Sequence, residues 1–479
     1  MRQSEALAIL ESGANVFLTG APGAGKTYVL NRFIAAARAA GASVAVTAST
    51  GIASTHINGQ TIHSWSGVGV ATALTDALYR TIRSRRRRKI EAADILVIDE
   101  VSMMHAWLFD MVDEVCRRLR RDPRPFGGLQ VVMSGDFFQL PPVSVSGRNH
   151  DLIAPPPEYV LMRERYAQAG LDPEGFVTES LVWDRLAPTV CYLTEQHRQD
   201  DGRLLGVLTD IRDGAVTDAD RDALVTRLGV MPSPGEVATH LFPVNRQADS
   251  LNDLRLAGID DDEHEFYAEQ SGPANLVDRL KRNMLAPEHL VLKTGAVVMA
   301  LRNDADRQYV NGSLGTVRGF TAESKGGWPI VEFENGNIVT MKPAAWEMMD
   351  GETVLASVGQ VPLRCAWAIT IHKSQGMTLE RAVMDLRRTF APGMGYVALS
   401  RVENMDGLFL GGVNERMFLV SPDAVRLDGR LRADSRAAAL RLDEDGPDAF
   451  VPRPSVAGSA GSDAGSGDTA PDFAQDELF

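Results

Sequence analysis

The feature that most constrains this chain is a glycine-rich segment near its N-terminus, with the sequence GAPGAGKT. It follows an apolar run that predicts a buried strand over residues 15–19, and it precedes a segment with helical periodicity. Glycines let backbone N–H groups approach phosphate oxygens, and a helix N-terminus adds positive potential. The spacing therefore predicts a phosphate-binding loop, the phosphate loop, made of Gly20, Ala21, Pro22, Gly23, Ala24, Gly25, Lys26 and Thr27.

Side chains in and beyond this loop indicate hydrolysis of a nucleoside triphosphate. Lys26 is expected to reach the β- and γ-phosphates, and Thr27 is expected to hold Mg²⁺. Farther along, the apolar run LVI ends in two carboxylates. Asp99 is expected beside the metal, and Glu100 is expected where it polarises a water molecule.

The pattern of apolar runs predicts the fold class. Runs at 43–47, 94–98 and 129–134 alternate with helical segments, as in a parallel, doubly wound α/β sheet. A second set predicts another α/β core, with strands at 190–193, 239–242, 365–370, 382–385, 396–399 and 407–411. Asn-Gly turns separate short strands in an interruption of that core, which predicts a small inserted β-barrel with strands at 296–301, 315–320, 330–334 and 338–342.

These patterns divide the chain into five parts. Residues 1–185 are expected to form the first core, which contains the phosphate loop. The second core is expected in two pieces, 186–290 and 362–430, around the inserted barrel at 291–361. Residues 431–479 are acidic and rich in glycine and serine, which predicts a disordered tail.

Composition limits the function without excluding nucleic acid. The net charge is −14, but residues 441–479 hold nine acidic residues and two arginines, so a net charge of −7 lies in that segment. A basic groove elsewhere is therefore compatible with the total. The three cysteines form no CxxC pair, which argues against zinc and a disulfide framework. The start of the chain leaves no room for a signal peptide, and the uncharged stretch 39–75 is too polar for lipid. We expect a cytoplasmic protein without a membrane partner.

Seven further motifs follow one another in order: TASTGIA (47–53), TIHS (61–64), VIDEVSM (97–103), GDFFQLPPV (135–143), YLTEQHR (192–198), AITIHKSQG (368–376) and YVALSR (396–401). In these motifs the chain resembles the Pif/RecD-like DNA helicases of superfamily 1B, over about residues 1–420. The segment VNGSLGTV (310–317) also resembles the small β-barrel of that family.

The resemblance implies two RecA-like P-loop NTPase cores, with ATP between them and single-stranded DNA across their top. Gln3 would then read the adenine, Gln139 would sense the γ-phosphate, and Gln375 would contact the nucleotide. Arg198 and Arg401 would be arginine fingers from the second core, a role worth ~10³–10⁵ in rate. The residues alone leave an alternative for each role. Gln3 is then a solvated helix residue, Gln375 braces its own loop through a hydrogen bond, and the two arginines form ion pairs at the surface.

The resemblance also places residues on the DNA face: Thr50, Gly51, His63, His372 and Lys373. Aromatic side chains that could stack on bases are Trp65, Phe137 and Phe138, and we select Phe138 as the DNA contact. For His63 the alternative is a structural histidine, and for the aromatic residues it is a place in the core. Two basic runs, at 83–89 and 117–121, either solvate a helix face or grip duplex DNA.

The end of the chain carries a short motif of its own. Gln475 to Phe479 reads QDELF, which resembles the peptide that docks in the bacterial sliding clamp. The alternatives are a chance match and a tail that competes with DNA for a basic groove. A bacterial, nucleoid-associated protein is the expectation that follows.

The sequence thus predicts an ATP-dependent DNA helicase with ATP and Mg²⁺ as cofactors, which acts on single-stranded DNA and duplex junctions. A 5′→3′ polarity and work in repair, recombination or replication follow from the resemblance alone. The alternatives are a translocase that unwinds poorly and a module in which ATP switches DNA or clamp binding. A pure switch has no use for the full hydrolytic set, which disfavours the module.

Overall fold

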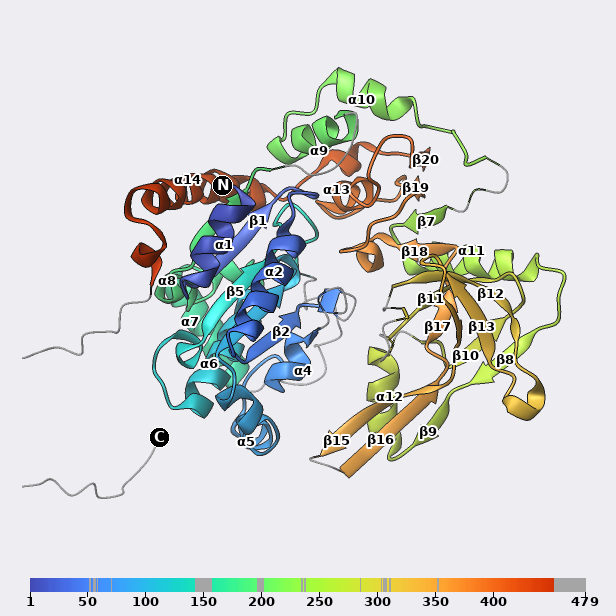
Figure 1. Cartoon of the computed structure of the whole chain (residues 1–479), viewed down its shortest axis with the longest axis horizontal. Coiled ribbons are helices and arrows are strands. Elements are labelled where there is room, and N and C mark those ends of the chain that lie inside the picture. Colours follow the sequence, from blue (N-terminus) through green and yellow to red (C-terminus); the bar gives the residue numbers. More distant parts are fainter. Residues whose placement is uncertain are drawn as a thin grey trace, which may run out of the picture.

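The computed structural model describes residues 1–50, 53–54, 57, 59–69, 71–142, 157–195, 202–233, 236, 238–284, 286–302, 304, 308–309, 312–350 and 353–451. Figure 1 shows the first core on the left, the second core at the upper right and the inserted region below the second core. Within the described ranges, no helix is long and apolar enough to cross a membrane.

The first core is built on a six-stranded sheet in the order β3-β2-β4-β5-β1-β6. All its pairings are parallel, which confirms the α/β prediction. Its strands are β1 (Val16–Gly20), β2 (Val44–Ala48), β3 (Gln60–Thr61), β4 (Ile95–Asp99), β5 (Gln130–Ser134) and β6 (Thr189–Leu193). Its helices are α1 (Gln3–Glu11), α2 (Lys26–Ala39), α4 (Ile62–Ser66), α5 (Asp76–Glu91), η1 (Val101–Met103), α6 (Ala106–Arg120), η2 (Pro125–Gly128), α7 (Pro157–Ala169), η4 (Val177–Glu179) and α8 (Trp183–Leu186).

The second core contains a smaller parallel sheet in the order β18-β7-β19-β20. Its strands are β7 (Thr239–Phe242), β18 (Ala368–Thr370), β19 (Ala382–Asp385) and β20 (Leu408–Gly412). Its helices are α9 (Arg203–Asp213), α10 (Asp218–Val225), α11 (Asn245–Ala257), η6 (Ile371–Ser374), α13 (Met394–Leu399) and η7 (Glu415–Phe418).

One strand predicted for the second core is a helix, and another belongs to the first core. Residues 396–399 belong to helix α13, whose residues are all buried; a short buried helix has the same unbroken apolar composition as a buried strand. The strand predicted at 190–193 exists as β6, but it pairs with β1 of the first sheet. The predicted boundary at residue 185 is therefore misplaced, because apolar composition does not encode which sheet a strand joins.

The inserted region is antiparallel, as predicted, and larger than predicted. Its main sheet has the order β14-β13-β12-β11-β17, formed by β11 (Val297–Ala300), β12 (Leu314–Phe320), β13 (Pro329–Phe333), β14 (Ile338–Thr340) and β17 (Leu363–Cys365). Among the described residues, β14 and β17 are the edges of this sheet, so closure into a barrel stays a prediction. The sequence did not indicate β8 (His264–Tyr267), β9 (Glu269–Ser271), β10 (His289–Leu292), β15 (Ala344–Asp350), β16 (Thr353–Gln360) or the helices α12 (Ala274–Asn283) and η5 (Glu323–Lys325).

The last described segment corrects the predicted tail. Helix α14 (Pro422–Asp445) and η8 (Pro447–Phe450) occupy the first twenty residues of the range predicted to be disordered. Leu431, Ser435 and Ala438 are buried, and the Ser435 hydroxyl accepts a hydrogen bond of 2.9 Å from the backbone N–H of Tyr192 in β6. Figure 1 shows α14 beside α1, on the first core. The prediction for residues 452–479 falls outside the described residues.

Candidate nucleotide and nucleic-acid site

The phosphate loop connects β1 to α2, and three of its glycines have positive φ: Gly20, Gly23 and Gly25. A Cβ on Gly20 would lie 2.7 Å from the carbonyl oxygen of Leu193, so only glycine fits where the loop passes β6. The Lys26 ammonium donates to the carbonyl oxygens of Gly20 (2.7 Å) and Ala21 (3.1 Å). Burial lowers the pKa of Lys26, and the carboxylates of nearby acidic residues oppose that change. The lysine side chain is therefore held against the loop, while its contact with the phosphates stays a prediction.

Gln3, the predicted adenine contact, is fastened to the phosphate loop. Its side-chain amide donates to the carbonyl oxygen of Ala24 over 3.1 Å, and its backbone N–H donates to the Glu195 carboxylate over 2.7 Å. A Cβ on Gly25 would lie 2.0 Å from the Gln3 amide nitrogen. Gln3 is thus held at the loop and is not a freely solvated residue, while its contact with adenine stays a prediction.

Two neighbouring carboxylates end β4, of which Asp99 is buried and Glu100 is half-buried. The backbone N–H of Glu100 donates to the Asp99 carboxylate over 3.0 Å, and Glu100 has a left-handed φ of 53°. Burial, with the Glu100 charge second, raises the pKa of Asp99 to about 7. Burial also raises the pKa of Glu100, against the opposing charges of Lys26 and Arg401. An acid pair of this kind favours binding of a cation beside it.

The second core reaches the acid pair directly. The side-chain amide of Gln375, which follows η6, donates to the Glu100 carboxylate over 3.1 Å. The Gln375 side chain is buried, and its amide oxygen has no hydrogen-bond donor in the described structure; the same holds for Gln139 of the first core. A buried acceptor without a donor costs ~1–3 kcal/mol. Each glutamine therefore presents an oxygen that a ligand or water can satisfy.

Arg401 lies inside the second core and not in a surface ion pair. It is 4% exposed, and its guanidinium donates to the carbonyl oxygens of Val397 (2.9 Å), Ser374 (3.1 Å) and Met377 (3.0 Å). Its charge nevertheless lowers the pKa of Glu100, which places it within electrostatic reach of the acid. Its contact with the transferring phosphate stays a prediction. Arg198, the second predicted finger, lies outside the described residues.

The predicted DNA-face residues come from both cores. The Thr50 hydroxyl accepts from the backbone N–H of Ala53 over 3.2 Å, and Gly51 lies outside the described residues. Burial lowers the pKa of His63 in α4 and of His372 and Lys373 in η6. These side chains are partly buried within short helices, and their contact with DNA stays a prediction.

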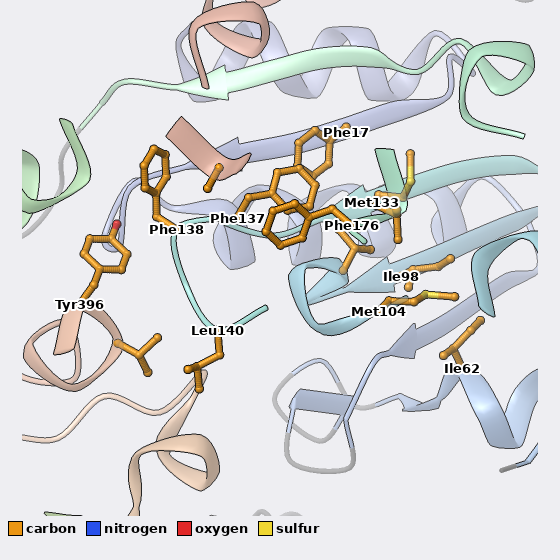
Figure 2. Packing of buried hydrophobic residues seen from close by; sticks show 14 of the residues in the cluster. Phe17, Ile62, Ile98, Met104, Met133, Phe137, Phe138, Leu140, Phe176 and Tyr396 are labelled. Carbon is orange, nitrogen blue, oxygen red and sulfur yellow. The ribbon is translucent and has the colours of Figure 1, made fainter. Parts of the chain in front are cut away.

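Phe138 is not on a DNA face, and that prediction is wrong. It is 2% exposed and its ring points toward Tyr396 of the second core, with ring centroids 6.4 Å apart (Figure 2). Phe137 packs between Phe17 and Phe176 inside the first core. Trp65 is also fully buried. In all three cases the apolar surface is used in packing, which sequence composition could not distinguish from a stacking surface.

The two basic runs have different surroundings. In α6, Arg117 pairs with Asp113 at 2.7 Å, Arg118 lies 3.7 Å above the Tyr79 ring, and Arg120 donates to four backbone carbonyl oxygens. Arg118 and Arg120 therefore join α6 to α5, whereas Arg117 pairs within its own helix. In α5 the basic side chains are mostly exposed, and Arg87 pairs with Glu91 at 2.7 Å.

Sequence reasoning missed a buried polar cluster between the cores, formed by Asp136, Tyr192, Arg212, Tyr396 and Asp428. Asp136 and the tyrosines lie within quoted motifs, but Arg212 lies in an ordinary amphipathic segment. The only sequence signal was Asp136 itself, an acidic residue beside an apolar run without an assigned partner. Burial of an arginine cannot be read from its position in the sequence.

A phosphate loop, an acid pair at the end of β4 and a second α/β core that contacts the acid define a nucleotide hydrolase with its site between two cores. Comparisons with known proteins give the family. The model of the PIF1-like helicase family matches residues 3–155, and the model of the 2B domain of the DNA helicase Pif1 matches residues 275–320. The chain belongs to the PIF1-like helicase family.

Relatives resemble the chain over most of its length. It is 36% identical to the ATP-dependent DNA helicase Pif1 of Psychrobacter sp., over 90% of this chain and 71% of that protein. Its identity to the Bdellovibrio bacteriovorus protein of the same name is 33%, over 88% of this chain and 89% of the relative. The Candida albicans Pif1 helicase structure superposes with a TM-score of 0.79 at 32% identity, covering 90% of this chain and 98% of the other. Bacteroides Pif1 bound to single-stranded DNA gives 0.69 at 27% identity, covering 91% and 97%.

The raised pKa of Asp99 predicts a pH-dependent stability. Replacing Asp99 with asparagine should stabilise the protein above pH 7 in the absence of nucleotide and metal, because ionising this buried carboxyl group costs free energy in the folded state. The gain should shrink as the pH falls from about 7 toward the ordinary value of 3.8, since the folded wild-type protein is then protonated there. Thermal unfolding in a chelating buffer from pH 4 to 8 measures this.

The exposed Asp76 provides the control, since Asp76→Asn should change the unfolding temperature little at any pH. A stabilisation by Asp99→Asn that is the same at pH 5 and pH 8 would contradict the assignment of a raised pKa.

Proposed function

We propose that this protein is an ATP-dependent DNA helicase that moves along single-stranded DNA and unwinds duplex DNA at junctions. The observation that carries the proposal is the hydrogen bond from Gln375 of the second core to Glu100 of the first. Because residues of both cores form the site, hydrolysis depends on the distance between the cores. The names of the relatives and the DNA-bound Bacteroides Pif1 structure support DNA as the track.

The residues of the site divide the hydrolysis of ATP among them. Lys26 binds the phosphates, and Glu100 accepts a proton from the attacking water. The Thr27 hydroxyl and the Asp99 carboxylate would hold Mg²⁺; they are oxygen donors, which this cation prefers, and the raised pKa of Asp99 fits a carboxylate that needs a cation. When bound, Mg²⁺ would neutralise part of the negative charge on the phosphates. Gln375 orients Glu100, and Arg401 adds positive potential from the second core.

Family membership supports a 5′→3′ polarity and a role in DNA repair, recombination or replication. The cysteine usage, three cysteines without a CxxC pair, supports a cytoplasmic location. Two other functions compete with this one. A translocase that unwinds poorly would have the same site, and unwinding assays separate it from a helicase. An ATP-switched DNA or clamp-binding module is disfavoured, because the acid pair and Lys26 form a hydrolytic set that a switch does not require.

The first test is ATP hydrolysis with and without single-stranded DNA. We expect strong stimulation by DNA in the wild type and loss of hydrolysis in Lys26→Ala, because the phosphates lose their cation. Glu100→Gln should lower kcat by ~10²–10⁴ while ATP still binds, because the base is removed and the phosphate contacts are kept. Glu91→Gln on exposed α5 is the matched control. Hydrolysis indifferent to DNA would refute the motor and leave the switch.

We further propose that the exposed face of α5 contacts duplex DNA at a junction. The helix holds seven basic residues and two acidic ones, within a chain whose net charge is −14. Like charges four residues apart, such as Arg83 and Arg87, destabilise an isolated helix, and phosphates would offset that repulsion. The helix also packs against α4, which carries His63: a Cβ on Gly67, at the end of α4, would lie 3.1 Å from Arg86.

Removing three of these charges tests the proposal. The triple variant Arg83→Ala, Arg88→Ala, Lys89→Ala should weaken binding to a forked duplex. The slope of the logarithm of the binding constant against the logarithm of salt concentration should fall by up to about three. Binding to single-stranded DNA should change little. The matched control removes three exposed arginines of α14: Arg426, Arg430 and Arg436. Equal losses in both variants, or equal losses for forked and single-stranded DNA, would contradict a duplex contact on α5.

For the end of the chain we propose a contact with the bacterial sliding clamp through Gln475 to Phe479. The support is the sequence QDELF after an acidic, glycine- and serine-rich segment. Leu478 and Phe479 are apolar side chains of the kind that bind in a pocket. Replacing Leu478 and Phe479 with alanine should abolish binding to purified clamp without changing ATP hydrolysis. Replacing Asp476 and Glu477 with alanine is the control for charge. If both variants bind the clamp like the wild type, the proposal fails.

A further inference from the structure

A fully buried arginine lies between the two cores, away from any assigned role. Arg212 of α9 is 3% exposed, and its guanidinium donates to the Asp136 carboxylate (2.7 Å), the Tyr396 hydroxyl (3.0 Å) and the Tyr192 hydroxyl (2.9 and 3.1 Å). Neighbouring Asp136 holds the pKa of Arg212 above its ordinary range despite burial. All three nitrogens are therefore satisfied by defined partners.

The partners of Arg212 come from opposite sides of the nucleotide site. Asp136 lies on the loop after β5, three residues before Gln139 of the first core. Tyr396 lies in α13 of the second core, five residues before Arg401. The Tyr396 hydroxyl also donates directly to the Asp136 carboxylate over 3.0 Å. One charged cluster thus joins the loop that carries Gln139 to the helix that leads to Arg401.

Packing holds the same two segments in close contact. A Cβ on Gly393, which precedes α13, would lie 2.6 Å from the carbonyl oxygen of Gln139 and 2.7 Å from that of Phe138. The Phe138 ring lies 4.2 Å beneath the Arg212 guanidinium, and Figure 2 shows Phe138 and Tyr396 pointing toward each other. The backbone of the Gln139 loop therefore touches the start of α13, and only a residue without a side chain fits between them.

A second layer connects the cluster to the C-terminal helix. The Tyr192 hydroxyl donates to the Asp428 carboxylate of α14 over 2.9 Å, and Arg432 bridges Asp428 (2.5 Å) and Asp213 at the end of α9 (3.2 Å). Helix α14 follows the last strand of the second core but packs on β6 of the first. The chain thus crosses between the cores on both sides of Arg212, once before α9 and once before α14.

We propose that Arg212 and Tyr396 are positioning residues for ATP hydrolysis: they hold the Gln139 loop in register with α13 and Arg401 without touching the nucleotide. The inference rests on the proposed ATPase function. A buried ion pair contributes little net stability compared with apolar packing, but it fixes geometry, because only one arrangement satisfies every donor. Displacing catalytic side chains by a fraction of an ångström slows hydrolysis more than it weakens ATP binding, because the reaction requires close alignment of groups from both cores.

The test removes one hydroxyl and compares it with a matched change inside one core. Tyr396→Phe keeps the ring and the Arg212–Asp136 pair but removes the hydroxyl that joins the cores. Tyr166→Phe removes another buried tyrosine–aspartate hydrogen bond, to Asp110, wholly within the first core. We expect Tyr396→Phe to lower the DNA-stimulated kcat about tenfold, with the KM for ATP nearly unchanged. Both variants should unfold at similar temperatures, and Tyr166→Phe should keep the wild-type kcat.

A double-mutant cycle separates positioning from simple destabilisation. If Tyr396 acts through the Gln139 loop, the kcat losses of Tyr396→Phe and Gln139→Ala should be strongly non-additive, whereas Tyr166→Phe with Gln139→Ala should be additive. Gly393→Ala, which displaces the same loop, should reproduce the kcat loss of Tyr396→Phe. Arg212→Lys, which keeps the charge but loses the planar donor set, should do the same if it remains folded.

Three results would overturn the inference: a wild-type kcat in Tyr396→Phe, an equal kcat loss in Tyr166→Phe, or additivity in the cycle with Gln139→Ala. Failure of the proposed function is distinguishable from these, because it would appear as a wild-type protein whose hydrolysis does not respond to single-stranded DNA.

Discussion

The constraint on which the site depends is the convergence of parallel strands at one edge of the first sheet. Because β1, β4 and β5 all run in the same direction, their carboxyl ends place the phosphate loop, the acid pair and the loop bearing Asp136 and Gln139 side by side. A buried site of this kind concentrates charge in a region of low dielectric. The raised pKa of Asp99 is the direct consequence, and it makes the site favourable for a cation.

The second core completes this site through a small number of polar contacts. Gln375 donates a hydrogen bond to Glu100, whereas Arg212 and Tyr396 donate to Asp136 on the loop that carries Gln139. The Gln375–Glu100 bond and the cluster of Arg212 and Tyr396 with Asp136 lie on two sides of the nucleotide site. A change in the angle between the cores therefore alters both. Such an arrangement lets nucleotide state and core movement influence each other, which is the physical requirement of a motor driven by hydrolysis. The close approach at Gly393 leaves little freedom for the cores to slide without breaking the cluster.

Much of the first core and of its nucleotide site was predictable, because both depend on local signals. The phosphate loop combines glycine spacing with a strand before it and a helix after it, and Asp99 ends the apolar strand predicted before it. Errors arose where one signal fits two structures. An apolar run predicted a strand at 396–399 that is a buried helix, and an aromatic pair beside Asp136 suggested base stacking although it packs in the core. Residues 431–450 looked like the start of a tail, yet a sparse apolar face is enough when β6 is there to cover it.

The sequence by itself predicted the chemistry: a phosphate loop, two carboxylates beside it, and the family of two-core enzymes that the motifs resemble. Spacing along the chain sets these features, because a loop of fixed length between a strand and a helix has few conformations. Only the tertiary structure decided which side chains face each other across the cores. Arg212 and Asp136 are separated by 76 residues, and Tyr396 lies 260 residues from Asp136. No local pattern encodes such a pairing, because it results from the packing of two sheets against each other and from the double crossing of the chain between them.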